Sequence, residues 1–341
     1  MTIWHVPIEP LEARYSQQWI DWFKQHMSIP GVWVQPNRRL RDDIQTGQFL
    51  DAHDTCSWKA QQIEMLVVNL NNGNIQDNDV LFFHDLWFPG IEALAYIRDA
   101  SGVNFKIAGC LHAGLWDFFD FLNQKGMGQW GLSFERSMLS LTDMIFVATE
   151  FHRRLIVNCH NWQVTRLDSK IHTTGFPIYA DHMPTPEPLE NRQHNLVVFP
   201  HRLAKEKGYE EFKILAREPA LKECEFVCTA EVCKTKAEYY NILAKAGVAV
   251  SIARQETWGI AMQEALFSGC FPIMPNRLAY PELYPADMLY NSQAECIEKI
   301  LWAVRDPSQA LSRADVVSRT LQHKGSTAIK RISEHLERLI S

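Results

Sequence analysis

At 341 residues the chain is longer than one average domain, so its length favours two domains. A hydrophobic content of 46%, with 22% charged residues and no long low-complexity tract, excludes a largely disordered chain. Residues 1–190 carry 14 Lys and Arg against 22 Asp and Glu, so the first half has no general attraction to nucleic acid. Any contact with nucleic acid would need a local basic strip.

Short apolar segments alternate with helical patterns along the first half, which is typical of a parallel α/β sheet. Strands are expected over residues 3–6, 32–34, 80–83, 105–110 and 144–147. Segment 176–192 is rich in proline and charge and has no periodicity, as in an interdomain connection. We therefore predict a first domain over residues 1–180 and a linker over 181–193.

The same alternation restarts in the second half. Strands are expected over residues 196–199, 226–228, 248–252 and 271–274, and helices near 209–217, 236–246, 258–268 and 295–304. This predicts a second domain over 194–322, followed within 323–341 by a C-terminal helix that packs back on the first domain. Two Rossmann-like, doubly wound domains facing a cleft bind ligands at the carboxyl ends of their strands.

The most informative segment, 254–272 (RQETWGIAMQEALFSGCFP), follows a buried strand and contains a helix. Thr257 is expected to cap the helix, and Gly269 to end it in a left-handed conformation. Glu256 then lies in the loop before the helix, and Glu264 lies within its first two turns. Two carboxylates at one helix N-terminus suit a ligand that carries hydroxyl groups.

The start of this helix is also a predicted anion site. The free N–H groups around Trp258, Gly259 and Ile260 carry partial positive charge, and Gly259 lets a phosphate approach the backbone. Segment 200–208 (PHRLAKEKG) places Arg202 and Lys207 after another strand, where they can clamp a pyrophosphate and stabilise a departing diphosphate. Together the two segments predict a nucleotide-sugar site.

These two segments resemble the retaining GT-B glycosyltransferases of family four. The family has G-R-L-x-x-x-K-G after the first strand of its second domain, then E-x-F-G-x-x-x-x-E and E-A-x-x-x-G-x-P. His201 replaces the leading glycine here, and Trp258 replaces the phenylalanine. The resemblance implies a GT-B fold, diphosphate binding by Arg202 and Lys207, a sugar contact from Glu256, and ribose binding by Glu264.

The first half resembles the family more weakly. Segment 105–114 is similar to the family's strand that ends in a histidine near the sugar, which implies such a role for His112. The paired-glycine loop after the first strand is absent, since Pro7-Ile8-Glu9-Pro10 stands there. Further acceptor-side candidates at or near strand ends are Glu9, Arg14, Asp85, Trp87 and Trp116.

The opening segment, residues 5–19, weakly resembles glycosyltransferase-like proteins of tailed bacteriophages. This resemblance implies an acceptor hydroxyl on a hydroxymethylated pyrimidine in double-stranded phage DNA. Arg38, Arg39 and Arg41 form the clearest basic strip of the acidic half and are candidate phosphate contacts.

Metal and membrane signals are weak. The D-x-D sequence at Asp77–Asp79 lies in a turn-rich loop before a strand, and His152, Cys159 and His160 lack a paired spacing for zinc. No cofactor or obligatory metal is therefore expected. The eight cysteines form no C-x-x-C pair, and neither a signal peptide nor a membrane span is evident, so we expect a cytoplasmic location without membrane insertion.

The prediction from sequence is thus a retaining hexosyl- or pentosyltransferase with a nucleotide-sugar donor, UDP-sugar being favoured. His112, Arg202, Lys207 and Glu256 are its predicted catalytic residues, with a hydroxymethylpyrimidine in DNA as the acceptor. The alternatives are a saccharide, lipid or small-molecule acceptor, epimerisation or hydrolysis of a nucleotide sugar, and a non-catalytic module that binds a sugar nucleotide.

Overall fold

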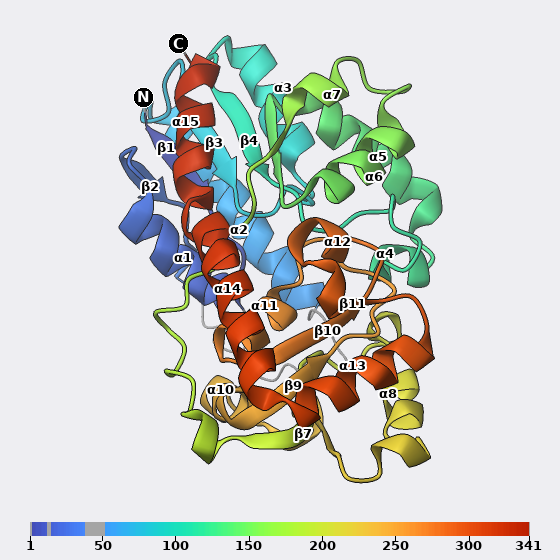
Figure 1. The fold of residues 1–341 in the computed structure, drawn as a ribbon. Helices are drawn as coiled ribbons and strands as arrows, with labels where there is room; N and C mark the ends of the chain where they lie inside the picture. Colours follow the sequence, from blue (N-terminus) through green and yellow to red (C-terminus); the bar gives the residue numbers. More distant parts are fainter. Residues whose placement is uncertain (1, 12–14, 38–51, 341) are drawn as a thin grey trace. The chain divides into compact units, whose positions relative to one another are not determined.

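The computed structural model of the protein describes residues 2–11, 15–37 and 52–340. The chain divides into two compact units, residues 1–177 with 327–341 and residues 178–326 (Figure 1). The first domain ends within three residues of the expected boundary and the C-terminal segment begins within four, but unit 2 begins at residue 178 instead of the expected 194. The segment expected as a linker, 181–193, belongs to the second unit and contains a 3-10 turn, Leu189–Asn191.

Unit 1 is built on a six-stranded parallel sheet in the order β2-β1-β3-β4-β5-β6. The strands are β1 (Ile3–Val6), β2 (Gly31–Trp33), β3 (Val80–Phe83), β4 (Lys106–Cys110), β5 (Met144–Val147) and β6 (Ile171–Thr173). Every residue of β1, β3 and β5 is buried. Apolar strands of this kind form the centre of a parallel sheet because helices cover both of its faces.

Eight helices are described in unit 1. They are α1 (Tyr15–His26), α2 (Ala52–Asn71), α3 (Ile91–Ser101), α4 (Phe121–Gln124), α5 (Gly128–Leu141), α6 (Glu150–His160), α7 (Leu167–Lys170) and α15 (Ala328–Ile340). The C-terminal α15 contacts α1 and β5 and so belongs to unit 1 rather than to the unit that precedes it in sequence.

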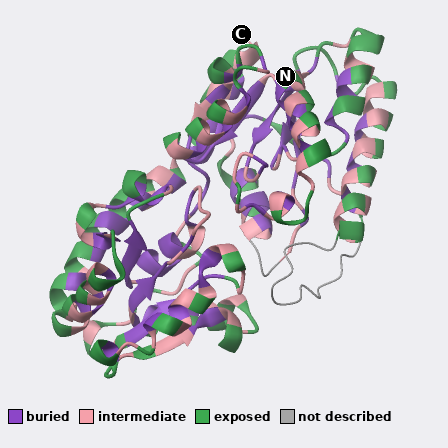
Figure 2. Ribbon diagram, turned by 90° about the vertical axis from the view of Figure 1, so that its right-hand side faces the viewer, coloured by how far each residue is buried: buried purple, intermediate pink, exposed green. Residues whose placement is uncertain are grey.

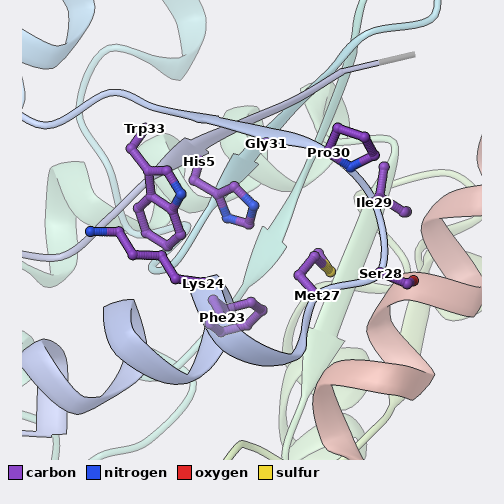
Figure 3. A pocket seen from close by; sticks show the side chains of 9 residues that line it. All are labelled: His5, Phe23, Lys24, Met27, Ser28, Ile29, Pro30, Gly31 and Trp33. Carbon is purple, nitrogen blue, oxygen red and sulfur yellow. The ribbon is translucent and has the colours of Figure 1, made fainter.

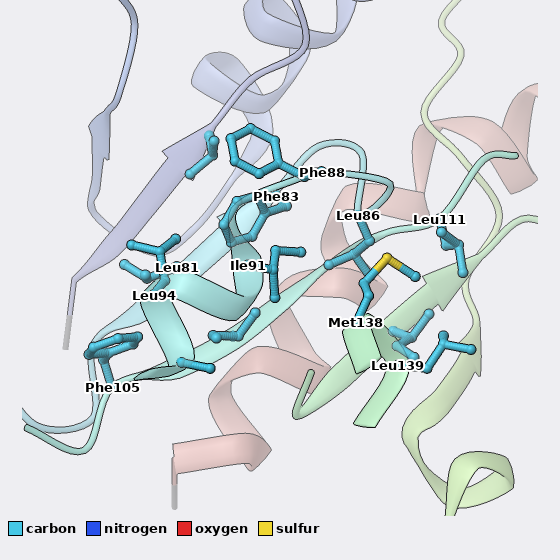
Figure 4. Close-up of a cluster of buried hydrophobic side chains, with 14 of the residues drawn as sticks. Leu81, Phe83, Leu86, Phe88, Ile91, Leu94, Phe105, Leu111, Met138 and Leu139 are labelled. Atoms are coloured by element: carbon cyan, nitrogen blue, oxygen red, sulfur yellow. The ribbon is translucent and has the colours of Figure 1, made fainter. Parts of the chain in front are cut away.

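The core of unit 1 forms between its sheet and α2, α3 and α5. Leu81 and Phe83 from β3 pack with Ile91 and Leu94 from α3, and Met138 of α5 joins the same cluster (Figure 4). All five side chains are almost completely buried. Burial of such a side chain contributes about 1.5–3 kcal/mol, so this layer holds the strand ends in fixed positions.

Unit 2 contains a second parallel sheet, in the order β11-β10-β9-β7-β8. Its strands are β7 (Gln193–Phe199), β8 (Glu225–Cys228), β9 (Ala246–Val250), β10 (Phe271–Pro275) and β11 (Leu289–Tyr290). Figure 2 shows buried strands in the middle of each unit and exposed residues on the surrounding helices. Two parallel sheets of this type are the mixed α/β architecture predicted from the sequence.

The α-helices of unit 2 are α8 (Tyr209–Leu215), α9 (Thr229–Val232), α10 (Lys236–Lys245), α11 (Ile260–Phe267), α12 (Tyr280–Leu283), α13 (Gln293–Arg305) and α14 (Pro307–Ser326). Three 3-10 turns join them, at Lys205–Lys207, Pro219–Leu221 and Ala286–Met288. The long α14, which the sequence analysis did not predict, packs against α11 and β10.

Candidate functional site

The loops that follow β7 and β9 meet at the carboxyl edge of the sheet in unit 2. These two strands are neighbours, so their loops emerge side by side. Gly208 has a φ of 80°, and a Cβ atom placed on it would lie 2.9 Å from the Ile252 carbonyl oxygen. Only glycine permits both this left-handed backbone and this close approach. The loop that carries Lys207 is thereby held against the loop that carries Glu256.

Lys207 and Glu256 form an ion pair in this place. The Lys207 ammonium donates to the Glu256 carboxylate at 3.2 Å and to the Gln255 carbonyl at 2.7 Å. Burial by itself would raise the pKa of Glu256, but the Lys207 ammonium, His201 and the Gly259 N–H lower it to about 2. Glu256 is therefore ionised throughout the neutral range, and Lys207 brings a buried positive charge to the strand edge.

The start of α11 differs from the prediction. The helix begins at Ile260, and its N-cap is Gly259, with a φ of 73°, rather than Thr257. The Glu256 carboxylate caps the end instead, since its Oε1 accepts from the N–H groups of Thr257 at 3.1 Å, Trp258 at 3.3 Å and Gly259 at 2.9 Å. The N–H groups of Trp258 and Gly259, predicted to be free for an anion, are thus engaged by a carboxylate of the chain.

Arg202 and Lys207 have different surroundings, although the sequence analysis paired them. The Arg202 side chain is 42% exposed and pairs with Glu206 one turn later, whereas the Lys207 side chain is 10% exposed. Arg202 would have to leave Glu206 to reach a diphosphate. Lys207 is held in place without a ligand.

His201, which replaces the family's glycine, is buried beside this site. Its Nε2 lies 2.9 Å from the Ser251 hydroxyl, which in turn lies 2.8 Å from the Tyr280 hydroxyl. Burial and the neighbouring Lys207 lower the pKa of His201 to about 3, so the ring is neutral. The sequence predicts no role for His201, Ser251 or Tyr280. The only signal for His201 as a site residue is its position between a buried strand and Arg202.

Glu264 lies in the second turn of α11 and is buried. Its Oε1 accepts from Lys236 Nζ at 2.7 Å and from the Tyr240 hydroxyl at 2.9 Å, and its Oε2 accepts from the Tyr239 hydroxyl at 2.9 Å. The three donors come from α10. The sequence analysis missed them because a helix of another segment contributes them.

In unit 1, His112 follows β4 at the carboxyl edge of the sheet. Its Nε2 lies 2.8 Å from the His84 carbonyl, to which it donates, and its Nδ1 lies 3.4 Å from the Tyr15 hydroxyl. The rings of Trp19 and Phe176 lie 4.8 and 4.6 Å from the imidazole. Burial lowers the pKa of His112, so it provides a neutral imidazole at a strand end.

Trp87 is anchored by a buried carboxylate. Glu135 of α5 accepts from the Trp87 indole at 3.0 Å, from the Leu115 N–H at 2.7 Å and from His160 at 3.1 Å. Glu135 and His160 are fully buried. Glu135 thereby ties together the loops after β3 and β4, which carry Asp85 and His112.

The remaining acceptor-side candidates are placed as follows. Asp85 accepts from the Trp87 N–H at 3.2 Å, and Trp116 packs near His152, with 6.0 Å between ring centroids. Glu9 is buried, and its carbonyl accepts from the Ser16 hydroxyl at 2.6 Å. Arg14, Arg38, Arg39 and Arg41 lie outside the described residues.

The acidic turn before β3 has a structural role. Asp79 accepts hydrogen bonds from the Thr2 N–H at 2.7 Å, the Trp4 indole at 3.3 Å and the Gln76 N–H at 3.1 Å. Its carboxylate therefore joins the first strand to the turn. Among the described residues no group of three or more His, Cys, Asp or Glu side chains is arranged to hold a metal ion.

A cavity of about 290 Å³ opens beside the edge strand β2. Figure 3 shows Lys24, Trp33 and His5 along one side of it and Met27 on the other. The His5 ring stacks on Trp33 with centroids 4.4 Å apart, and its Nδ1 lies 3.1 Å from His84 Nε2. None of the residues nominated from sequence lines this cavity, so the strand edge of unit 2 remains the better candidate site.

No helix within residues 2–11, 15–37 and 52–340 is long and apolar enough to cross a membrane.

Comparison with known proteins finds similar sequences and similar structures. No family model matches the chain. A tRNA-queuosine alpha-mannosyltransferase of Drosophila melanogaster is 42% identical over 72 residues, which are 21% of this chain and 19% of that protein. The chain thus matches less than a fifth of the length of this relative.

The similar structures extend over most or all of the chain. The UDP-forming alpha,alpha-trehalose-phosphate synthase of Burkholderia vietnamiensis has a TM-score of 0.66 at 13% identity, covering 100% of this chain and 97% of that one. HepE of Anabaena, determined with UDP and glucose, has a TM-score of 0.63 at 10% identity, covering 98% and 99%.

The pneumococcal O-GlcNAc transferase GtfA, determined with UDP and GlcNAc, has a TM-score of 0.55 at 14% identity. It matches 83% of this chain, which spans only 60% of GtfA. With two parallel sheets and structural neighbours that are GT-B glycosyltransferases, the chain has the GT-B fold predicted from its sequence.

Proposed function

We propose that the protein is a retaining glycosyltransferase that uses a nucleotide-sugar donor held by unit 2. The observation that carries the proposal is the meeting of buried Lys207, ionised Glu256 and the start of α11 at adjacent strand ends. Glu264 lies one turn further along the same helix. The buried cation suits a diphosphate, and the two carboxylates suit the hydroxyl groups of the sugars on either side of it.

In the proposed reaction the bond between the anomeric carbon and the diphosphate oxygen breaks, and its electron pair stays with the diphosphate. Lys207, with Arg202 once released from Glu206, stabilises the charge that develops there. The acceptor hydroxyl attacks from the same face, and its proton passes to the departing phosphate oxygen. Glu256 orients the sugar, and neutral His112 is a candidate for holding the sugar or the acceptor. Because Lys207 supplies the positive charge, we propose that no metal is obligatory.

UDP is the favoured nucleotide, since HepE and GtfA were both determined with UDP. The donor is tested by incubating the protein with UDP-, GDP- and ADP-sugars and measuring release of nucleoside diphosphate, with and without EDTA. We expect slow release from one donor class, undiminished by EDTA. Lys207→Ala should slow this release by about tenfold or more, whereas Lys213→Ala, which removes an exposed lysine, should not. If no donor releases nucleoside diphosphate, the proposed glycosyltransferase activity is contradicted.

For the acceptor we propose a hydroxyl on a modified nucleoside in nucleic acid. The sequence analysis favours a hydroxymethylated pyrimidine in DNA, for which a base must leave the stack at a cost of a few kcal/mol. Phosphate contacts from Arg38, Arg39 and Arg41 could offset part of this cost and would make binding salt-sensitive.

A second acceptor is favoured by the fly relative, whose name gives a queuosine nucleoside of tRNA as its substrate. The relative is similar over 72 residues, so this reading is likewise a proposal for the present chain. Both acceptors offer a hydroxyl on a modified base, and both require the donor site of unit 2.

To distinguish the two acceptors, the protein and its donor are incubated with DNA that contains hydroxymethylcytosine or hydroxymethyluracil. A separate incubation uses tRNA that contains queuosine. Unmodified DNA, tRNA without queuosine and free oligosaccharides serve as controls. The nucleic acids are then digested, and their nucleosides analysed by mass spectrometry for a hexose or pentose adduct. A sugar adduct on the nucleosides of either the DNA or the tRNA identifies that nucleic acid as the acceptor. Transfer to the oligosaccharides alone would contradict both proposals and leave a saccharide acceptor.

A further inference from the structure

The donors that surround the Glu264 carboxylate come from one face of α10. Lys236, Tyr239 and Tyr240 are spaced i, i+3 and i+4, so all three side chains point toward α11. Thr235 caps α10 in a capping box with Glu238, which fixes the first turn and therefore the position of Lys236. The arrangement is thus built into the helix rather than formed by a mobile surface chain.

The Lys236 ammonium is held on three sides. It lies 2.7 Å from Glu264 Oε1 and 5.1 and 5.0 Å from the ring centroids of Tyr239 and Tyr240. Aromatic faces attract a cation at such distances. The Lys236 side chain is 22% exposed and that of Glu264 is 5% exposed, so the pair lies at the edge of solvent. A ligand can reach this edge.

The hydrogen bonds leave one part of the carboxylate open. A carboxylate offers about four acceptor positions, two on each oxygen. Among the described residues Oε1 receives two donors, Lys236 and Tyr240, while Oε2 receives one, Tyr239. One acceptor position therefore remains on Oε2, and the Tyr239 hydroxyl, which donates to it, can still accept. Two neighbouring acceptors of this kind match the two adjacent hydroxyls of a ribose.

We propose that Lys236 and Tyr240 are positioning residues that turn Glu264 so that Oε2, together with the Tyr239 hydroxyl, receives the 2′- and 3′-hydroxyls of the donor nucleotide. The proposal rests on the proposed function, which places a nucleotide at Glu264. It assigns to α10 the preference for a ribonucleotide over a nucleotide without these hydroxyls. If Lys236 only neutralised a buried carboxylate, its loss would weaken every nucleotide alike.

The test is calorimetric binding of a nucleoside diphosphate and of its 2′,3′-dideoxy analogue to the full chain. UDP, GDP and ADP are each measured. The wild type should prefer the ribonucleotide by about tenfold or more, since hydrogen bonds to a charged group contribute about 1.5–3 kcal/mol. Lys236→Met should remove most of this preference and change affinity for the dideoxy analogue by less than about twofold. Lys236→Arg should restore the preference, because it keeps a cation on Oε1.

Two further variants keep the test decisive. Tyr239→Phe removes a single hydroxyl and should also lower the preference, even if Lys236→Met does not fold. Lys213→Met removes an ammonium that pairs with Glu210 and lies over the Tyr209 ring, so it is a matched control that should change nothing. Equal weakening of both ligands by Lys236→Met, or an unchanged preference in both α10 variants, would overturn the inference.

The outcome also separates this inference from the proposed function. If the wild type binds none of the three nucleotides, the nucleotide-sugar proposal fails together with the inference. If the wild type binds one of them and Glu264→Gln keeps the ribose preference, the role of α10 is wrong while nucleotide binding at unit 2 stands.

Discussion

At the residue scale, Lys207 neutralises buried Glu256, and it is also the proposed contact to the donor diphosphate. Lys207→Ala should lower kcat/KM for the donor by about tenfold or more and also lower the melting temperature, because it leaves a buried carboxylate unpaired. Arg202→Ala should lower kcat/KM with little change in melting temperature, since Arg202 is exposed. Steady-state kinetics and thermal unfolding of both variants measure these effects.

A double variant separates the two roles of Lys207. Lys207→Ala with Glu256→Gln should recover part of the lost stability, because no buried charge remains unpaired, but it should not recover activity. An unchanged kcat/KM in Lys207→Ala would contradict diphosphate binding by this residue.

The two glutamates should differ in their kinetic effect. Glu264→Gln should mainly raise the donor KM, because a ribose contact is the same in the ground state and the transition state. Glu256→Gln should lower kcat more, if its sugar contact tightens as positive charge develops on the ring. Donor-dependent initial rates distinguish the two variants, and the opposite order would mean that their roles are exchanged.

At the scale of elements, the buried pair of Glu135 and His160 joins α5 to α6. Burial lowers the pKa of His160, but the Cys159 and Glu135 side chains raise it, to about 9. Because the folded-state pKa lies above the value of about 6.5 for an unfolded chain, the stabilisation is complete below pH 6.5 and is lost as the pH rises through 9. We expect His160→Gln to cost about 3 kcal/mol at pH 6 and much less at pH 10.

Urea unfolding of wild type and His160→Gln at both pH values measures this difference. His172→Gln is a suitable control, since burial and nearby charges lower the pKa of His172 to about 4 and it is neutral over the whole range. A free-energy difference between wild type and His160→Gln that does not change with pH would contradict a charged His160.

At the scale of the whole molecule, the chain returns to unit 1 after completing unit 2. Ile329, Ile332 and Leu336 of α15 are fully buried there, although about 150 residues of unit 2 precede them. Ile332→Ala and Leu336→Ala should each cost about 2–5 kcal/mol in the free energy of unfolding. Chemical denaturation measures the loss, with exposed Lys330→Ala as the control. A loss below about 0.5 kcal/mol in both variants would show that α15 is not a core element.

The local patterns of the sequence determined most of the strands and the position of Glu264 in α11. Apolar runs such as 80–83 and 144–147 become strands because their residues are buried on both faces of a parallel sheet. The short edge strands β6 and β11 were missed, since a few residues carry too little periodicity. The polar α14 was missed as well, because its helical pattern becomes evident only where it packs on α11.

Only the tertiary structure decided what each charged side chain contacts. The sequence placed Glu256 before a helix and Lys207 after a strand, but their ion pair depends on the neighbouring positions of β7 and β9. Glu256 rather than Thr257 caps α11, because Gly259 turns the backbone so that three N–H groups reach one carboxylate. Lys236 and Glu264 are 28 residues apart in the sequence. Their contact depends on the packing of α10 against α11 and cannot be predicted from local spacing.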